Sequence, residues 1–122
     1  VATWVNNIQL DAAAIEYDAA GAPRQATLDW RAGATLSTDY TVFVQVLDGA
    51  NRILAQADFQ PQQGQAPTST WRVGDAIRDT ATWAGDVGDW ARIIVGLYDA
   101  QGQRLAVRAP STLPDAVEIA AP

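Results

Sequence analysis

The sequence predicts an all-β domain, folded as an antiparallel two-sheet sandwich of the jelly-roll or immunoglobulin-like type with eight or nine short strands. Apolar and polar residues alternate with a period of two along much of the chain, which is the pattern of half-buried strands. Turn-forming residues recur about every ten residues. The 122 residues, 48% of them hydrophobic, suffice for a single domain spanning residues 1–122 with its own core.

Residues 8–17 admit two interpretations. Ile8 and Leu10 alternate with polar neighbours, as a strand requires. The alanine-rich run from Asp11 to Tyr17, with Gly21 beyond it, also suits a short helix with an aspartate N-cap and a glycine stop. We favour the strand, because the neighbouring segments are strands and a helix of this length would be marginal.

Residues 25–31 and 40–47 predict two further strands. The residues expected to face the core are Ala26, Leu28 and Trp30 in the first and Val42, Val44 and Val46 in the second. A turn at residues 48–51 and a return strand over residues 52–59 complete a hairpin. Residues 60–74 are rich in polar and breaker residues and predict a long loop.

The second half of the chain predicts strands at residues 76–83, 93–99 and 115–119. Residues 93–99, with a turn at 100–103 and a return at 104–107, copy the order of the first hairpin. A weak internal duplication would explain this similarity, but we favour the explanation that β-hairpins in general share this residue pattern. Residues 109–122 are either a trailing linker or an edge strand, and the chain is expected to be a piece of a larger protein.

An apolar patch is expected on the outer face of the sheet formed by these hairpins. Phe43, Leu47 and Tyr98 alternate away from the core valines, and Gly96 beside Tyr98 would leave a groove. We expect the loop at residues 60–74 to fold over this patch with Trp71, the alternative being a partner domain.

Asp79 is the one charge on a core-facing side of a predicted strand, and a buried carboxylate must be paired or hydrogen-bonded. We assign it as a structural anchor. Its expected partners are backbone N–H groups of residues 71–74, or the side chain of Arg31 or Arg72.

The composition excludes several kinds of chemistry. There is no Cys and no His, so disulfides, thiol catalysis, His-containing triads and the usual zinc ligands are ruled out. All eight basic residues are Arg, which excludes a Schiff-base lysine. The net charge of −6 opposes binding to nucleic acid or to anionic membranes, and no apolar run is long enough to insert into a membrane. We predict no cofactor.

The 14 carboxylates are the only groups available for acid–base catalysis. Asp86 and Asp89, like Asp75 and Asp79, are close in sequence, and a glycosidase needs two carboxylates that flank its bond. Both pairs lie where turns are expected, and aspartate is common in turns. The same interpretation is favoured over calcium binding at residues 86–89 and 99–103. We therefore assign no catalytic residue and no metal site.

The five tryptophans are the strongest indication of function, because exposed aromatic rings make good platforms for sugars. Trp30 and Trp90 are expected in the core, and Trp4 at one end of the sandwich. Trp71 and Trp83 are the candidates for ligand binding, although closing the ends of the sandwich is favoured for both. Their candidate companions are Arg72 and Tyr98.

Tryptophan, proline, glycine and aspartate residues follow one another in a fixed order between residues 10 and 107. They are Leu28-Asp29-Trp30-Arg31-Ala32, Asp39-Tyr40-Thr41-Val42-Phe43-Val44, Asp58, Pro61, Gly64, Pro67-Thr68, Trp71, Gly74, Asp79, Val95-Gly96-Leu97-Tyr98-Asp99, Gly102 and Arg104-Leu105. In this the chain resembles a β-sandwich domain of bacteria, especially Chloroflexi, that often follows the membrane region of glycosyltransferases of the dolichyl-phosphate-mannose protein mannosyltransferase type. The chain departs from that family at Gln45, where a His is frequent, and at Gly88-Asp89-Trp90, where Gly-x-Tyr is frequent.

The resemblance implies an extracytoplasmic location, attachment to a membrane-anchored or exported parent, and an accessory role near glycan or lipid-linked sugar chemistry. Asp58, one of the residues that carry it, is assigned with Asp79 as a structural anchor. The sequence thus favours a non-catalytic accessory or docking domain whose partners are other domains of the parent chain. Carbohydrate binding through exposed tryptophans is the alternative, and a glycoside-acting hydrolase is a remote third.

Overall fold

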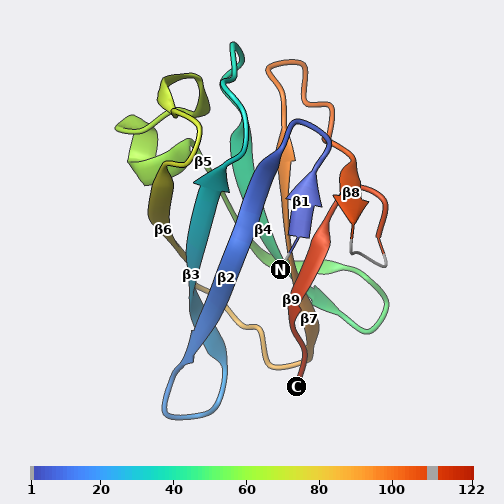
Figure 1. The fold of residues 1–122 in the computed structure, drawn as a ribbon. Coiled ribbons are helices and arrows are strands. Elements are labelled where there is room, and N and C mark those ends of the chain that lie inside the picture. Colours follow the sequence, from blue (N-terminus) through green and yellow to red (C-terminus); the bar gives the residue numbers. More distant parts are fainter. Residues whose placement is uncertain (1, 110–112) are drawn as a thin grey trace.

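Nine strands form two antiparallel sheets in the computed structural model, which describes residues 2–109 and 113–122. The strands are β1 (Ala2–Trp4), β2 (Ile8–Tyr17), β3 (Pro23–Ala32), β4 (Thr41–Asp48), β5 (Ile53–Phe59), β6 (Ala76–Thr82), β7 (Trp90–Tyr98), β8 (Val107–Ala109) and β9 (Val117–Ala120), with 3-10 turns η1 (Pro61–Gly64) and η2 (Thr68–Thr70). One sheet has the order β6-β3-β2-β1-β8 and the other β5-β4-β7-β9 (Figure 1). The predicted all-β sandwich is confirmed. The described residues contain no helix that could span a membrane.

The alanine-rich segment is a strand, as favoured. β2 pairs with β3 from Ile8↔Ala32 to Tyr17↔Pro23, with a shift in register at Asp11. Its backbone groups are therefore satisfied by a neighbouring strand rather than within a helical turn. The high helix propensity of alanine is a weak preference, and pairing along ten residues overrides it.

The core lies between the sheets and is built from the alternating residues that the sequence indicated. Leu28 and Trp30 of β3 and Val44 of β4 are all at most 1% exposed. The rings of Trp4 and Trp30 lie 5.5 Å apart and tilted at 52°. Trp4 is fully buried, and the pairing of β1 with β2 places it level with Ile8, the first residue of β2.

Three turns share one five-residue form, and they span residues 18–22, 48–52 and 99–103. In each, one carboxylate oxygen of the first aspartate accepts the N–H groups of the third and fifth residues. The fourth residue has a positive φ, at Gly21 (84°), Asn51 (64°) and Gly102 (77°). Glycine and asparagine tolerate this conformation. The similarity of the two predicted hairpins therefore reflects shared turn chemistry.

The second predicted hairpin is only partly correct. Residues 104–107 do not form a full return strand; one bridge joins Tyr98 to Arg104, and the N–H of Leu105 donates to the carbonyl of Leu97. The chain then crosses to the other sheet as β8, which pairs with β1. β9 takes the place beside β7, so residues 117–120 are an edge strand. Residues 110–112 of the expected linker or edge strand lie outside the described part.

The outer patch exists, but its expected cover is wrong. Phe43 and Leu47 form a second buried cluster with Ile94 and Ala116, against which Tyr98 and Leu113 pack. The guanidinium of Arg104 lies 4.3 Å from the centre of the Phe43 ring. Trp71 belongs to the main core instead. The patch is thus covered by residues 113–116 and Arg104, because β9 returns along the edge of the same sheet.

Candidate ligand-binding site

The ring of Trp71 is buried, with 3% of the residue exposed. Its indole N–H donates to the carbonyl of Ala66 at 2.9 Å. Arg72 is exposed, and its backbone N–H donates to the Asp75 carboxylate at 2.9 Å. The loop-closing interpretation of Trp71 fits this burial, whereas a sugar platform needs an exposed face.

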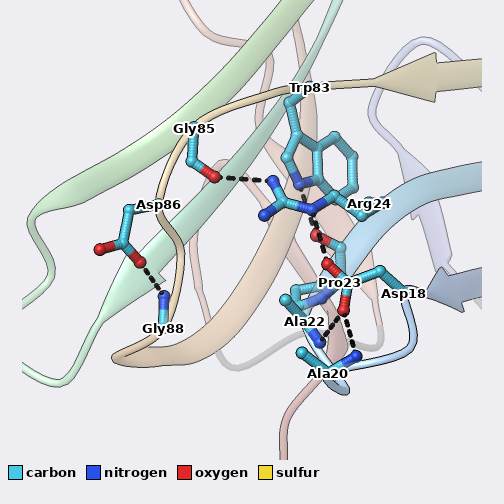
Figure 2. Close-up of polar contacts among 9 residues, drawn as sticks. All are labelled: Asp18, Ala20, Ala22, Pro23, Arg24, Trp83, Gly85, Asp86 and Gly88. Atoms are coloured by element: carbon cyan, nitrogen blue, oxygen red, sulfur yellow. Dashed lines mark hydrogen bonds and ion pairs between the residues drawn. The ribbon is translucent and has the colours of Figure 1, made fainter.

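Trp83 lies just past the opposite end of β6 from Trp71 and is 9% exposed. Its indole N–H donates to the carbonyl of Pro23 at 2.9 Å (Figure 2). Trp83 therefore ties the β6–β7 loop to the start of β3. The candidates Trp71, Trp83 and Tyr98 do not converge on one surface, since Tyr98 lies on the outer face of the other sheet.

Asp79 is buried as predicted, but its partner is not the one expected. One carboxylate oxygen accepts the backbone N–H of Gln62 at 3.2 Å and the other that of Thr80 at 3.0 Å. The anchored segment is η1, where Gln62 and Gln63 both have positive φ. Burial raises the pKa of Asp79, and the two N–H groups oppose that rise.

This pKa direction gives a pH prediction. A carboxyl whose pKa is raised in the folded state favours unfolding while it is ionised, and that penalty disappears as pH falls through the folded pKa towards the unfolded value. Relative to Asp79→Asn, the wild type should therefore gain stability as pH falls from 7 towards 4. Urea denaturation of both proteins across that range measures the difference, in which the other carboxylates cancel. A wild-type stability that stays constant or falls relative to Asp79→Asn on acidification contradicts it.

Removing the acceptors altogether should destabilise the protein at every pH. Asp79→Ala leaves the N–H of Gln62 without its partner, at a cost of about 1–3 kcal/mol. Circular dichroism melting measures the loss.

A pocket of about 290 Å³ opens at the end of the sandwich where the β2–β3 turn meets the β6–β7 loop. We call it the pole pocket and define it by Asp18, Arg24, Asp86, Gly88 and Trp90, which line it. In Figure 1 the β2–β3 turn and the β6–β7 loop, which line it, lie at the lower end of the sandwich, opposite η1 and η2. Two elements more than 60 residues apart in sequence thus build it.

Aromatic surface borders the pole pocket. Trp90, which begins β7, lines it and is partly exposed. Tyr17, which ends β2, is 50% exposed, and its ring centre lies 6.1 Å from that of Trp90 at a tilt of 43°. Sugars stack on such rings through their apolar C–H faces. Trp90, although it packs against the main core, is therefore more accessible than Trp71 and Trp83.

Arg24 is the central polar group of the pole pocket. Its Nε–H donates to Asp18 at 3.1 Å and one terminal nitrogen to the carbonyl of Gly85 at 2.7 Å, as Figure 2 shows. These bonds fix the plane of the guanidinium and use two of its five N–H groups. The side chain is 34% exposed, so the remaining donors are within reach of a ligand.

The carboxylates of the pole pocket act as acceptors. The N–H of Ala22, followed by the Arg24 guanidinium, lowers the pKa of Asp18 below its usual range. Asp86 is exposed, and one of its oxygens accepts the N–H of Gly88 at 2.9 Å, as Figure 2 also shows. An ionised acceptor beside a fixed donor can bind neighbouring hydroxyls of one ligand. Within residues 2–109 and 113–122, no group of three His, Cys, Asp or Glu could hold a metal ion.

The sequence interpretation missed Tyr17, Arg24 and Trp90 as site residues. Trp90 was expected in the core because it opens an apolar strand. Two local features could have indicated these residues. The tight turn that begins at Asp18 brings Arg24 back beside Asp18, and Trp90 stands at the end of the segment of β7 that pairs with β4. Neither feature shows that the two segments meet.

Asp58 and Tyr98 are brought together away from the pole pocket. The Tyr98 hydroxyl donates to the Asp58 carboxylate at 2.8 Å on the outer face of the four-stranded sheet. Burial raises the pKa of Tyr98, and the hydrogen bond to Asp58 raises it further. Asp58 thus anchors the Tyr98 side chain rather than a loop. No protein-family model, curated protein or solved structure matches the chain.

Proposed function

We propose that this chain is a non-catalytic accessory domain of a larger, exported or membrane-anchored bacterial protein, and that it binds carbohydrate at the pole pocket. The partly exposed Trp90 ring beside the fixed guanidinium of Arg24 carries the proposal. An aromatic face for C–H groups next to charged donors and acceptors for hydroxyls is the arrangement that sugar recognition needs. The resemblance to domains that follow membrane glycosyltransferases supports the accessory role.

Two alternatives are less well supported. A hydrolase needs two carboxylates that flank its bond, one of them held protonated. The pKa of Asp79 is raised, but this carboxyl is buried and both of its oxygens accept backbone N–H groups, while the pKa of Asp18 in the pole pocket is lowered. A docking domain was expected to have buried tryptophan rings and an apolar patch at an interface. Trp71 and Trp83 are buried, but the Phe43 cluster is covered within the chain. Binding of a polar ligand therefore explains the exposed polar groups of the pole pocket better than either alternative does.

The proposal predicts that substitutions in the pole pocket weaken sugar binding without unfolding the domain. Isothermal titration with cellohexaose, mannohexaose, maltohexaose and chitohexaose should show binding of at least one. Arg24→Gln removes the fixed donors, and Tyr17→Ala removes an exposed ring beside Trp90. Each should weaken that binding at least about tenfold, equivalent to about 1.4 kcal/mol.

Arg31→Gln is the matched control, since Arg31 forms an exposed ion pair with Asp11 near the other end of β3. Its affinity should equal that of the wild type, and melting curves should show all three variants folded. Failure of all four sugars to bind, or unchanged affinity in both pocket variants, would rule out sugar binding at this pocket.

A further inference from the structure

The outer face of the four-stranded sheet carries a groove made of two adjoining hollows. One, of about 230 Å³, is lined by Asp58, Tyr98 and Arg104, and the other, of about 340 Å³, by Arg92 and Asn51. Both are also lined by Gln45 and Arg104. We call their union the sheet groove. It lies over β4 and β7, whereas the pole pocket lies at the end of the sandwich.

Arg104 lies in the middle of the sheet groove, where it lines both hollows. Its guanidinium carbon lies 4.3 Å from the centre of the Phe43 ring, a cation–π contact. Its polar contacts are long: 3.5 Å to the Gln45 amide oxygen and 3.7 Å to an Asp115 oxygen. The side chain is 38% exposed. Arg104 is thus oriented by packing, while its N–H groups are poorly used by the protein and free to serve a ligand.

The two ends of the sheet groove present opposite hydrogen-bonding groups. At one end the Asp58 carboxylate accepts the Tyr98 hydroxyl and keeps a second oxygen for a ligand hydroxyl. At the other end Arg92 bonds to the Asn51 amide oxygen and lies 4.0 Å from Glu118. The sheet groove therefore offers a hydrogen-bond acceptor at one end and donors at the other.

The charge of the sheet groove favours an uncharged ligand. Arg92 and Arg104 contribute two positive charges to its lining, and Asp58 and Asp115 contribute two negative charges that balance them. Neither an anion nor a cation would find an excess of opposite charge there. Hydroxyl groups, which both donate and accept, satisfy carboxylates and guanidiniums alike.

The shape of the sheet groove favours an extended ligand. Its floor runs from Phe43 to Leu47 along β4, roughly 13 Å at about 3.3 Å per residue. Two hollows that share Gln45 and Arg104 suit consecutive units of one polymer.

We propose that the sheet groove binds a neutral, extended oligosaccharide lying along β4 and β7, with Arg104 as the central donor and Asp58 as the acceptor at one end. This site is separate from the pole pocket and does not depend on it.

Nuclear magnetic resonance titration of the ¹⁵N-labelled domain distinguishes the two sites. The probes are cellohexaose, mannohexaose, maltohexaose and chitohexaose, each with its monosaccharide. For at least one hexasaccharide, the amide signals of Gln45, Gly102 and Arg104, which line the groove, should shift, and the matching monosaccharide should bind at least tenfold more weakly. Signals of Arg24 and Trp90 report the pole pocket in the same spectra. Shifts confined to Arg24 and Trp90 overturn the proposed groove site and leave the proposed function standing. Shifts confined to the groove signals overturn sugar binding at the pole pocket and support the groove site.

Variants complete the test. Arg104→Gln and Asp58→Asn should each weaken hexasaccharide binding at the groove signals at least tenfold, while Arg78→Gln, an exposed arginine paired with Asp29 on the other sheet, leaves it unchanged. If Arg104→Gln unfolds the domain because the contact with the Phe43 ring is lost, Gln45→Ala replaces it as the groove variant and should weaken binding in the same way. Equal affinity in the groove variants, equal affinity for monosaccharide and hexasaccharide, or no groove shift with any probe overturns the proposal.

Discussion

Trp71→Ala is expected to lower the free energy of unfolding by about 3–5 kcal/mol, the usual cost of emptying a buried tryptophan site. The ring is part of the main core, and its indole N–H satisfies the carbonyl of Ala66. The chain around it is also held in place: the buried Thr68 hydroxyl donates to the carbonyl of Thr38 and accepts the N–H of Tyr40. After the ring, the N–H of Gly74 donates to the carbonyl of Ala32 at 2.8 Å. Because the loop is thus anchored on both sides of Trp71, it cannot collapse easily into the cavity.

Trp71→Phe is the informative companion variant. It keeps most of the ring volume but leaves the Ala66 carbonyl without its donor, at a cost of about 1 kcal/mol. Urea denaturation measures both variants. A stability of Trp71→Ala within about 1 kcal/mol of the wild type would show that the loop does not close the core. Sugar binding by folded Trp71→Phe should be unchanged, since Trp71 lines neither proposed site.

Gly96→Ala is expected to cost about 1–3 kcal/mol through overpacking. A Cβ at Gly96 would overlap Cε2 and Cζ of the Phe43 ring and lie 3.0 Å from the carbonyl oxygen of Asp115. The ring cannot move outwards freely, because Arg104 lies above it. The missing side chain therefore gives Phe43 its place on the outer face, where its ring occupies the space above Gly96.

A double-mutant cycle tests this cause. Phe43→Ala alone should cost about 3–5 kcal/mol, and adding Gly96→Ala to it should cost much less than in the wild type, because the overlap is gone. Gly49→Ala is the matched control: a Cβ there meets nothing within 4 Å, so its stability should change by less than about 0.5 kcal/mol. Equal costs of Gly96→Ala in both backgrounds would place the strain elsewhere.

The two proposed sites share one principle. In each, an arginine is oriented by contacts within the chain, Arg24 by hydrogen bonds and Arg104 by the Phe43 ring, and it keeps donors for a ligand. A side chain that is ordered before binding loses little conformational entropy when the ligand arrives.

The sequence by itself determined the fold class, most of the longer strands and the direction of most side chains. Side chains alternate on any extended backbone, so the valines of β4 and the burial of Asp79 follow from local order alone. The aspartate turns are likewise local, since each carboxylate bonds within five residues of its own position.

Only the tertiary structure decided which segments meet. The pole pocket joins the β2–β3 turn to the β6–β7 loop, Trp71 enters the core rather than covering Phe43, and Asp79 holds η1 rather than residues 71–74. Likewise the strand beside β7 is β9, although residues 104–107 are nearer in sequence. These contacts depend on pairings between residues far apart in the chain, and the local alternation of apolar and polar residues is the same whichever partner a strand takes.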